Sequence, residues 1–300
     1  MKDDSEKILL SVVVPIGNMV GNLQFIESWL HNVKNYSLEV ILVLDQTFLN
    51  VGPELEELLQ SVNSSKVILI HGIFGDPGSA RNAGLGIATG SWIGFWDSDD
   101  SPNVKNIFAA IEISQEYDEI LVGNFSVLDI KTMKYRTPIK NVNGINSVAM
   151  NPGIWRMIFR IQTICDTKFP NLKMGEDQVF LAHLNFGMRK LRFVESIFYQ
   201  YNVGGTSQLT RSTLALKDLP LASSIILEHA KVAQRKQSIF DMQLVFRQQI
   251  TIMKKGDILL KFSIFKFIRK YFKKFSFTFL TESVIALTRI LRTITSAAIK

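Results

Sequence analysis

The chain has 300 residues, of which 47% are hydrophobic and 20% are charged, and this composition is typical of a folded protein with a full core. Its net charge is +7, and a single cysteine, Cys165, excludes a disulfide framework and a cysteine-rich metal site. We expect Cys165 to be a buried structural thiol in a reducing, cytoplasmic protein. No stretch reaches the ~18 uncharged apolar residues of a membrane span, and no targeting segment is visible.

The first hundred residues alternate between predicted strands and helices. Val-rich and Leu-rich runs are typical of strands buried on both faces, whereas apolar residues three and four apart indicate helices. The predicted strands are 9–16, 38–44, 66–70 and 92–96, and the predicted helices are 22–33, 54–62 and a short segment after residue 76 that Gly90 ends. This alternation predicts an α/β fold with a doubly wound, mostly parallel sheet.

After residue 100 the pattern is less regular. The expected elements are a helix over 103–113, a strand over 120–128, a polar irregular segment over 129–151, a segment of mixed period over 155–164, a helix over 176–186 closed by Gly187, a strand over 191–199, and one long helix or two over 221–254.

Residues 76–100 contain the densest group of chemically useful side chains. A turn of small residues opens a short helix with Arg81, and the next strand ends in Asp97, Asp99 and Asp100. Ligands of α/β sheets lie at the C-terminal ends of parallel strands, and crowded carboxylates repel one another unless a cation lies among them. We therefore predict a divalent cation here. The alternative is a turn in which these aspartates cap the following helix.

Five blocks of sequence, in the same order, resemble glycosyltransferase family 2, whose members have the GT-A fold. The blocks are 11–18 (Ser-Val-Val-Val-Pro-Ile-Gly-Asn), 43–45 (Val-Leu-Asp), 78–84 (Gly-Ser-Ala-Arg-Asn-Ala-Gly), 95–100 (Phe-Trp-Asp-Ser-Asp-Asp) and 175–180 (Gly-Glu-Asp-Gln-Val-Phe). One block alone is a weak signal, but five in order across residues 8–210 are a strong one. The resemblance implies a nucleotide-sugar donor and a divalent cation, Mn or Mg.

The resemblance also implies roles for single residues. It places the donor nucleotide on Pro15, Asn18, Asp45, Gly78, Arg81, Asp97 and Asp100, and the metal on Asp97 and Asp99. Asp45 would accept a hydrogen bond from a base N–H, as suits uracil, and the Arg81 guanidinium suits phosphate oxygens. The alternatives are an Asp45 bonded to nearby backbone and an Arg81 paired with the acidic cluster. The second alternative is compatible with phosphate binding.

The fifth block supplies the expected catalytic residues. The resemblance makes Asp177 the general base that takes the proton of the acceptor hydroxyl, with Glu176 beside it as an orienting group. One in-line displacement then inverts the anomeric configuration. The alternative is a pair of helix N-terminal acids favoured by the helix dipole. Trp155 and Phe159 would form either a sugar-stacking wall or part of the core.

The chain departs from the family pattern at three places near the donor site. Gly17 stands where the family usually has tyrosine, residues 46–48 read Gln-Thr-Phe instead of Gly-Ser-Thr, and Asp76 replaces a frequent asparagine. These departures bear on the donor nucleotide and not on the fold.

The positive charge is concentrated in the last seventy residues. Residues 231–300 contain 15 Lys and Arg against three acids, a net charge of +12. On a helix over 260–275, one face is apolar and the other carries Lys266, Arg269, Lys270, Lys273 and Lys274, with Phe262 breaking the pattern. Such a helix suits an anionic membrane surface. The alternative is a helix docked on the protein with its basic face in solvent. No nucleic-acid-binding module is recognised.

We therefore expect a GT-A domain over residues 1–215 and a helical, basic, amphipathic region over 216–300. The expected activity is inverting, metal-dependent transfer of a hexosyl group from a nucleotide diphosphate sugar, with UDP as the first choice. The acceptor would be a hydroxyl of a lipid-linked or bacterial envelope glycan, such as lipopolysaccharide or capsule. The protein would be peripheral on the inner face of the cell membrane.

Two rival functions are kept open. An aspartyl phosphotransferase of the haloacid dehalogenase type also carries Asp-Xaa-Asp after an apolar strand, with the first Asp as nucleophile. That motif normally opens the fold, whereas three predicted strands precede it here. The second rival is a non-catalytic, membrane-associated assembly protein, against which the retained Arg81, Asp99 and Asp177 argue.

Overall fold

A computed structural model describes residues 8–17, 23–45, 52–62, 64, 66–142, 144–205, 214–261, 263–264, 281 and 283–290. The chain divides into two compact units. The first comprises Met1–Lys140, Ile154–Lys168 and Lys190–Gln208, and the second comprises Asn141–Gly153, Phe169–Arg189 and Leu209–Lys300. Asn18 and residues 265–275 of the predicted basic helix lie outside the described residues.

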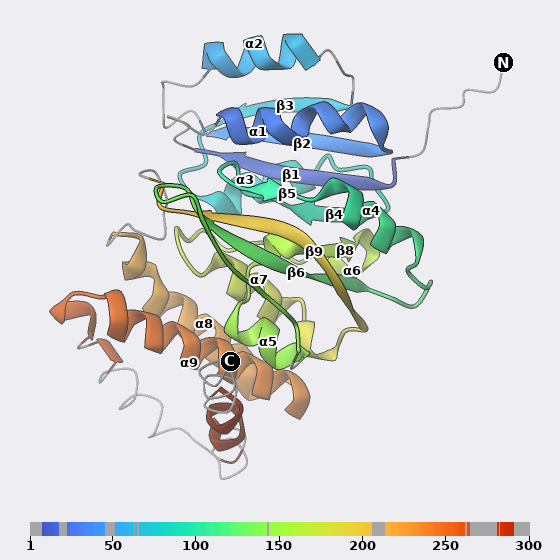
Figure 1. Ribbon diagram of the computed structural model, residues 1–300. Helices are drawn as coiled ribbons and strands as arrows, with labels where there is room; N and C mark the ends of the chain where they lie inside the picture. Colours follow the sequence, from blue (N-terminus) through green and yellow to red (C-terminus); the bar gives the residue numbers. More distant parts are fainter. Residues whose placement is uncertain are drawn as a thin grey trace. The chain divides into compact units, whose positions relative to one another are not determined.

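The first unit is built on a sheet whose nine described strands follow the order β3-β2-β1-β4-β8-β6-β9-β5, with β7 paired to β6 (Figure 1). Four neighbouring strands are parallel: β3 (Val67–Gly72), β2 (Leu38–Asp45), β1 (Leu10–Ile16) and β4 (Trp92–Phe95). The remaining strands are β5 (Ser101–Pro102), β6 (Ile120–Asp129), β7 (Lys134–Ile139), β8 (Met157–Arg160) and β9 (Leu191–Val203). Among these, β8 is antiparallel to β4 and β6, whereas β6 and β9 are parallel.

Helices cover both faces of this sheet, as the doubly wound prediction requires. Side chains of a strand alternate between faces. Leu10, Val12 and Val14 of β1 join one core with helices α1 (Leu23–Leu30), α2 (Gly52–Val62) and α4 (Val104–Glu112). A short 3-10 helix, η1 (His31–Asn35), follows α1.

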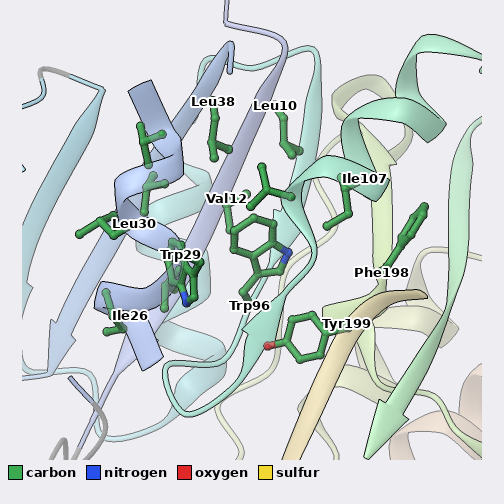
Figure 2. Packing of buried hydrophobic residues seen from close by; sticks show 14 of the residues in the cluster. Leu10, Val12, Ile26, Trp29, Leu30, Leu38, Trp96, Ile107, Phe198 and Tyr199 are labelled. Atoms are coloured by element: carbon green, nitrogen blue, oxygen red, sulfur yellow. The ribbon is translucent and has the colours of Figure 1, made fainter. Parts of the chain in front are cut away.

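Within this core the Trp29 and Trp96 rings meet edge to face with centroids 5.2 Å apart (Figure 2). On the other face, Gly84 of α3 (Pro77–Leu85) lies against Val13 and Val43. A Cβ at residue 84 would stand 2.4 Å from Cγ1 of Val13, so this close approach of helix to sheet requires glycine.

The second unit is helical in its described residues. Its elements are α5 (Ile145–Met150), α7 (Glu176–His183), η3 (Phe186–Met188), η5 (Ala215–Asp218), α8 (Leu219–Val232) and α9 (Arg235–Lys255). The region predicted as one long helix or two is therefore two helices, separated at residues 233–234. None of the described helices is both long enough and apolar enough to cross a membrane.

Four local predictions were wrong. The helix expected over 176–186 and closed by Gly187 ends at His183, and Gly187 lies within the 3-10 helix η3. The segment expected to be irregular contains β7 and α5. Strand β7 was not predicted because it is polar and exposed, so its residues do not alternate between buried and exposed positions.

The short helix ends at Leu85, where Gly86 donates its N–H to the Asn82 carbonyl, and not at Gly90. The predicted burial of Cys165 is also wrong, because this residue is exposed.

Smaller elements complete the first unit. The segment of mixed period at 155–164 holds the end of η2 (Ile154–Arg156), strand β8 and the one-turn helix α6 (Ile161–Ile164). Gly90, which does not end a helix, passes so close to β1 that a Cβ there would lie 2.5 Å from the Ser11 nitrogen.

Candidate active site

Residues Asp97, Ser98, Asp99 and Asp100, which we call the acidic tip, follow the buried strand β4. The strand is apolar and fully buried, so the chain reaches the edge of the sheet with the aspartates as its first polar side chains. Asp97 and Asp99 are partly exposed, whereas Asp100 has no exposed surface. The tip therefore offers two carboxylates to a ligand and keeps the third beneath the surface.

Arg81 forms an ion pair with the first of these carboxylates. Its Nη2 donates to Oδ1 of Asp97 at 2.8 Å, and the two side chains are 6% and 28% exposed. Arg81 lies on α3, whose N-terminus is capped by Asp76, which accepts the Ser79 N–H at 2.8 Å and its hydroxyl at 2.7 Å. The pairing predicted as an alternative is therefore present, and Asp97 keeps an exposed edge.

The acidic tip has the chemistry of a divalent-cation site but not a complete set of protein ligands. Carboxylate oxygens such as those of Asp97 and Asp99 are the ligands that Mg²⁺ and Mn²⁺ prefer. Across the part of the chain that the structure describes, no group of three or more His, Cys, Asp and Glu is gathered to hold a metal. The tip fits a cation that takes one or two carboxylates and completes its shell with phosphate oxygens and water.

Burial perturbs the third carboxylate of the tip. Burial raises the pKa of Asp100 well above its ordinary value, and the carboxylates of Asp99 and Asp97 raise it further. The backbone N–H of Asn202 donates to Oδ1 of Asp100 at 2.7 Å and opposes this shift. Asp100, which was predicted to contact the donor nucleotide, is therefore the buried member of the tip and is held by β9.

Two residues of β9 contact the acidic tip, and sequence analysis did not identify them. The Tyr199 hydroxyl accepts the N–H of Asp97 at 2.8 Å. The Asn202 side chain donates from Nδ2 to the carbonyl of Asp99 at 2.9 Å. These residues lie about a hundred positions downstream, and the antiparallel pairing of β5 with β9 brings them to the tip. No local motif announces such a contact.

Asp45 ends β2 and is 6% exposed. Its Oδ1 accepts the N–H of Phe74 at 3.1 Å, and its Oδ2 accepts the N–H of Gly75 at 2.8 Å. The carboxylate thus holds the loop that follows β3. This agrees with the alternative in which Asp45 bonds to backbone groups.

The other predicted donor-site residues that are described lie at the same edge. Pro15 is near the C-terminal end of β1, paired in register with Val43 and half buried. Gly78 is buried in the first turn of α3. Strands β1, β2 and β4 are parallel, so Pro15, Asp45 and the acidic tip lie at one edge of the sheet.

Glu176 and Asp177 begin α7 in the second unit. Gly175 precedes them with φ of +88°, and a Cβ there would lie 2.9 Å from that of Ala222, so both conformation and packing require glycine. Glu176 is buried, and Asp177 is half buried with Oδ1 accepting the N–H of Gln178 at 2.8 Å. The two acids occupy the first turn of a helix, as predicted.

A buried polar network holds the other end of α7. Gln237 of α9 donates from Nε2 to the Ala182 carbonyl at 3.4 Å, and its Oε1 accepts the Gly187 N–H at 2.6 Å. The same Nε2 donates to Asp241 at 2.6 Å, and Asp241 also bonds to Nδ1 of His229 at 2.7 Å. Burial raises the pKa of Asp241 to about 6, and these two hydrogen bonds oppose the shift.

The aromatic residues before α7 are packed rather than open. Trp155 is half buried and stacks on Tyr199 and Tyr201, with centroids 4.7 Å and 5.5 Å apart. Phe159 is fully buried and tilted against Phe95. Phe159 is therefore core and not a sugar-stacking wall, whereas Trp155 packs on the core with part of its surface exposed.

A mostly parallel sheet with helices on both faces, and an Arg–Asp pair with further carboxylates at the C-terminal ends of its strands, are the features expected of GT-A nucleotide-sugar transferases. The chain belongs to glycosyl transferase family 2, which matches residues 11–189, and it is therefore a glycosyltransferase. This membership removes the phosphotransferase rival. No curated protein matches the sequence significantly.

Solved structures share the fold at low sequence identity. Residues 1–349 of S. aureus TarS in complex with UDP-GlcNAc give a TM-score of 0.65 at 17% identity, covering 85% of this chain and 78% of that one. The mannosyltransferase PcManGT from Pyrobaculum calidifontis, in complex with GDP-Man and Mn²⁺, gives 0.55 at 11% identity, covering 95% and 86%. The predicted GT-A fold is confirmed.

Proposed function

We propose that this glycosyltransferase moves a hexosyl group from a UDP-sugar to a hydroxyl of a lipid-linked or envelope glycan, with inversion at the anomeric carbon. The observation that carries the proposal is the acidic tip at the C-terminal end of β4, where Arg81 pairs with Asp97 beside Asp99. One guanidinium and two accessible carboxylates can together hold a diphosphate and its cation.

The donor would lie along the edge formed by β1, β2 and β4. Arg81 supplies a planar, permanently charged donor for phosphate oxygens, and Gly78 lets the backbone at the start of α3 approach them. Asp45 and the loop that it holds would contact the base, with Pro15 and Asn18 completing the donor site. Asp100 supports the tip from below through its bond to Asn202.

Asp97 and Asp99 are the residues that we propose to hold Mn²⁺ or Mg²⁺. A bound cation would offset the negative charge of the departing nucleoside diphosphate. PcManGT, a structure of the same fold, contains both GDP-Man and Mn²⁺.

We further propose that Asp177 is the general base and that Glu176 orients the acceptor. The base takes the proton of the acceptor hydroxyl while its oxygen attacks the anomeric carbon and the bond to the diphosphate breaks. A single displacement needs no covalent nucleophile. The buried Glu176 and the half-buried Asp177 give the two acids different environments, as different roles require.

The acceptor and the location follow from the charge distribution. Residues 1–215 would form the transferase domain, and the basic region 216–300 would bind the anionic inner face of the cell membrane. At that surface the protein would meet a lipid-linked glycan acceptor.

A thermal-shift series tests the donor and the metal together. UDP with Mn²⁺ is expected to raise the unfolding temperature more than either alone, because a ligand that binds only the folded state stabilises it. A screen for hydrolysis of nucleotide sugars with metal present then identifies the sugar. A shift with GDP and none with UDP would replace the base assignment, and no shift with any nucleotide would refute the donor site.

A further inference from the structure

We propose that β9 is a positioning element for the acidic tip, and that Tyr199 and Asn202 are positioning residues that set the metal affinity of Asp97 and Asp99. The proposal rests on the proposed function, because it concerns the same cation. It adds two residues that lie outside the five family-like blocks and about a hundred positions from the tip.

Tyr199 fixes the first residue of the tip. Its hydroxyl accepts the Asp97 N–H at 2.8 Å, so the backbone of the residue that pairs with Arg81 is tied to β9. The Tyr199 ring is fully buried beside Trp96 in the core (Figure 2). Trp155 stacks on it, with ring centroids 4.7 Å apart.

Asn202 fixes the second half of the tip with two bonds. Its Nδ2 donates to the Asp99 carbonyl at 2.9 Å, and its backbone N–H donates to the Asp100 carboxylate at 2.7 Å. The side chain of Asn202 is fully buried, and its Oδ1 accepts a hydrogen bond from Nε2 of Gln200 at 3.0 Å. This bond orients the amide so that the Nδ2 faces Asp99.

The chain then continues along β9 by backbone pairing. Ser101 and Pro102 pair antiparallel with Gln200 and Tyr199, and the Asn103 N–H donates to the Phe198 carbonyl at 2.8 Å. The segment from 97 to 103 is thus bonded to β9 repeatedly along its length. Neither Asp97 nor Asp99 can change its backbone position without breaking these bonds.

A metal site gains affinity when its ligands are held in place before the ion arrives. Groups that hydrogen-bond to ligands or orient them typically change metal affinity by 10–100-fold when they are removed. Tyr199 and Asn202 bond to the backbone of the two proposed ligands in these contacts, and not to their carboxylates. Their removal should therefore weaken metal binding while the phosphate-binding Arg81 and the rest of the donor edge remain.

The test uses two variants and two matched controls in the full chain. Tyr199→Phe removes only the hydroxyl, and Asn202→Ala removes the amide. Tyr36→Phe is the control for the first, since this ring also packs in the core, against Phe108. Asn124→Ala is the control for the second, since Asn124 is also buried and donates to a β9 carbonyl, that of Glu195, at 2.6 Å.

Calorimetric titration with Mn²⁺ at saturating UDP measures metal affinity without any turnover. We expect Tyr199→Phe and Asn202→Ala to weaken Mn²⁺ binding at least about 10-fold, with UDP affinity at saturating Mn²⁺ close to that of wild type. Both controls should retain wild-type Mn²⁺ affinity. Tyr199→Phe is conservative enough to fold, so the proposal remains testable even if Asn202→Ala does not fold.

Two outcomes overturn the proposal, and they can be told apart. If wild type shows Mn²⁺-dependent UDP binding and Tyr199→Phe keeps its Mn²⁺ affinity, or the controls lose as much, then β9 has only a structural role. If wild type binds neither UDP nor Mn²⁺, the donor site itself is wrong, and the positioning proposal falls with it.

Discussion

Asp97, Asp99 and Asp100 are three adjacent acids with three different environments. Asp97 is paired with Arg81, burial pushes the pKa of Asp100 well above its ordinary value, and Asp99 lies partly exposed between them. Asp97 is thus engaged by a guanidinium and Asp100 lies beneath the surface, so replacement of the partly exposed Asp99 tests the proposed cation site most directly.

Replacing Asp99 with alanine should abolish metal-dependent UDP binding while the fold survives. The change removes an oxygen ligand at a partly exposed position, so it creates no buried cavity. Calorimetric titration with UDP, with and without Mn²⁺, measures the effect, and far-UV circular dichroism checks the fold. Asp166→Ala, at an exposed aspartate of the same unit, is the control. Unchanged affinity and metal dependence in Asp99→Ala would show that the cation binds elsewhere.

Asp177→Asn should leave donor binding near normal and lower the rate of transfer by at least ~10²-fold, the lower end of general-base contributions. The amide preserves the shape of the side chain, and its oxygen can still accept the Gln178 N–H. Single-turnover transfer and donor titration separate chemistry from binding. A variant that keeps most of its transfer rate would move the base elsewhere, with Glu176 as the next candidate.

The parts of the site that could be predicted from sequence are those whose residues lie close together along the chain. Arg81 and the acidic tip fall within one 25-residue segment, and strand ends can be located from apolar runs. Tyr199 and Asn202 could not be predicted, because their link to the tip depends on a pairing between β5 and β9 across about a hundred residues. Long-range pairing leaves no periodic signal in either segment.

At the scale of elements, the strands that are buried on both faces could be predicted from the sequence, whereas an exposed strand could not. The strands β1, β2 and β4 are largely apolar, and each was predicted within a residue or two of its bounds. Strand β7 is exposed along most of its length and polar, so its pattern resembles that of a loop. Helix α5 has only six residues, too few for a helical period.

The contact of α3 with the sheet gives a stability prediction. Gly84→Ala would place a Cβ 2.4 Å from a methyl carbon of Val13, and such overpacking costs about 1–3 kcal/mol of unfolding free energy. Gly86→Ala is the matched control, because this residue has helical φ of −65° and its nearest contact would be an ordinary 3.4 Å. Urea unfolding of both variants measures the difference. Equal stabilities would mean that α3 does not lie this close to β1.

The network that holds α7 gives a prediction about pH. A raised carboxyl pKa means that the folded state binds the proton more tightly than the unfolded state, so this contribution to stability is present at low pH and is lost as pH rises. For Asp241, whose pKa is about 6 against an ordinary 3.8, the loss occurs between about pH 4 and 6 and amounts to roughly 2–3 kcal/mol.

The variant Asp241→Asn has no titrating carboxyl group at this position, so comparison with wild type isolates the titration of Asp241. The unfolding free energy of wild type minus that of the variant should fall as pH rises from 4 to 6.5, measured by urea unfolding at each pH. His183 makes an opposite contribution to the pH dependence, because burial and the nearby His229 lower its pKa. Both proteins contain His183, so its contribution cancels in the comparison. A difference that grows with pH would mean that the bond to His229 outweighs burial and keeps Asp241 ionised.

At the scale of the whole molecule, the basic residues are concentrated near the C-terminal end of the chain, but the same region also contains buried apolar residues. The basic excess lies after residue 230, yet part of that region is core: Leu260 and Ile264 are each 8% exposed and pack with Leu216, Leu219 and Ile252. Ala286 and Ile290 are fully buried. Truncation before Gly256 would therefore remove core side chains, and substitution of the charges alone is the cleaner way to test membrane binding.

Neutralising the five bases of the predicted polar face should release the protein from anionic vesicles. The variant changes Lys266, Arg269, Lys270, Lys273 and Lys274 to Gln. Each base near an anionic surface contributes up to about 1 kcal/mol, so five together decide whether binding is measurable, and added salt should weaken the wild-type binding in the same direction.

The control is a second variant in which five exposed lysines of the first unit, Lys105, Lys131, Lys134, Lys140 and Lys168, are changed to Gln. It has the same net charge as the tail variant, so co-sedimentation with vesicles of phosphatidylserine and phosphatidylcholine compares position and not total charge. Hydrolysis of the sugar donor should be unchanged in both, since the donor blocks all lie before residue 101. Equal loss of vesicle binding in the two variants would mean that overall charge, and not the tail, attracts the protein to membranes.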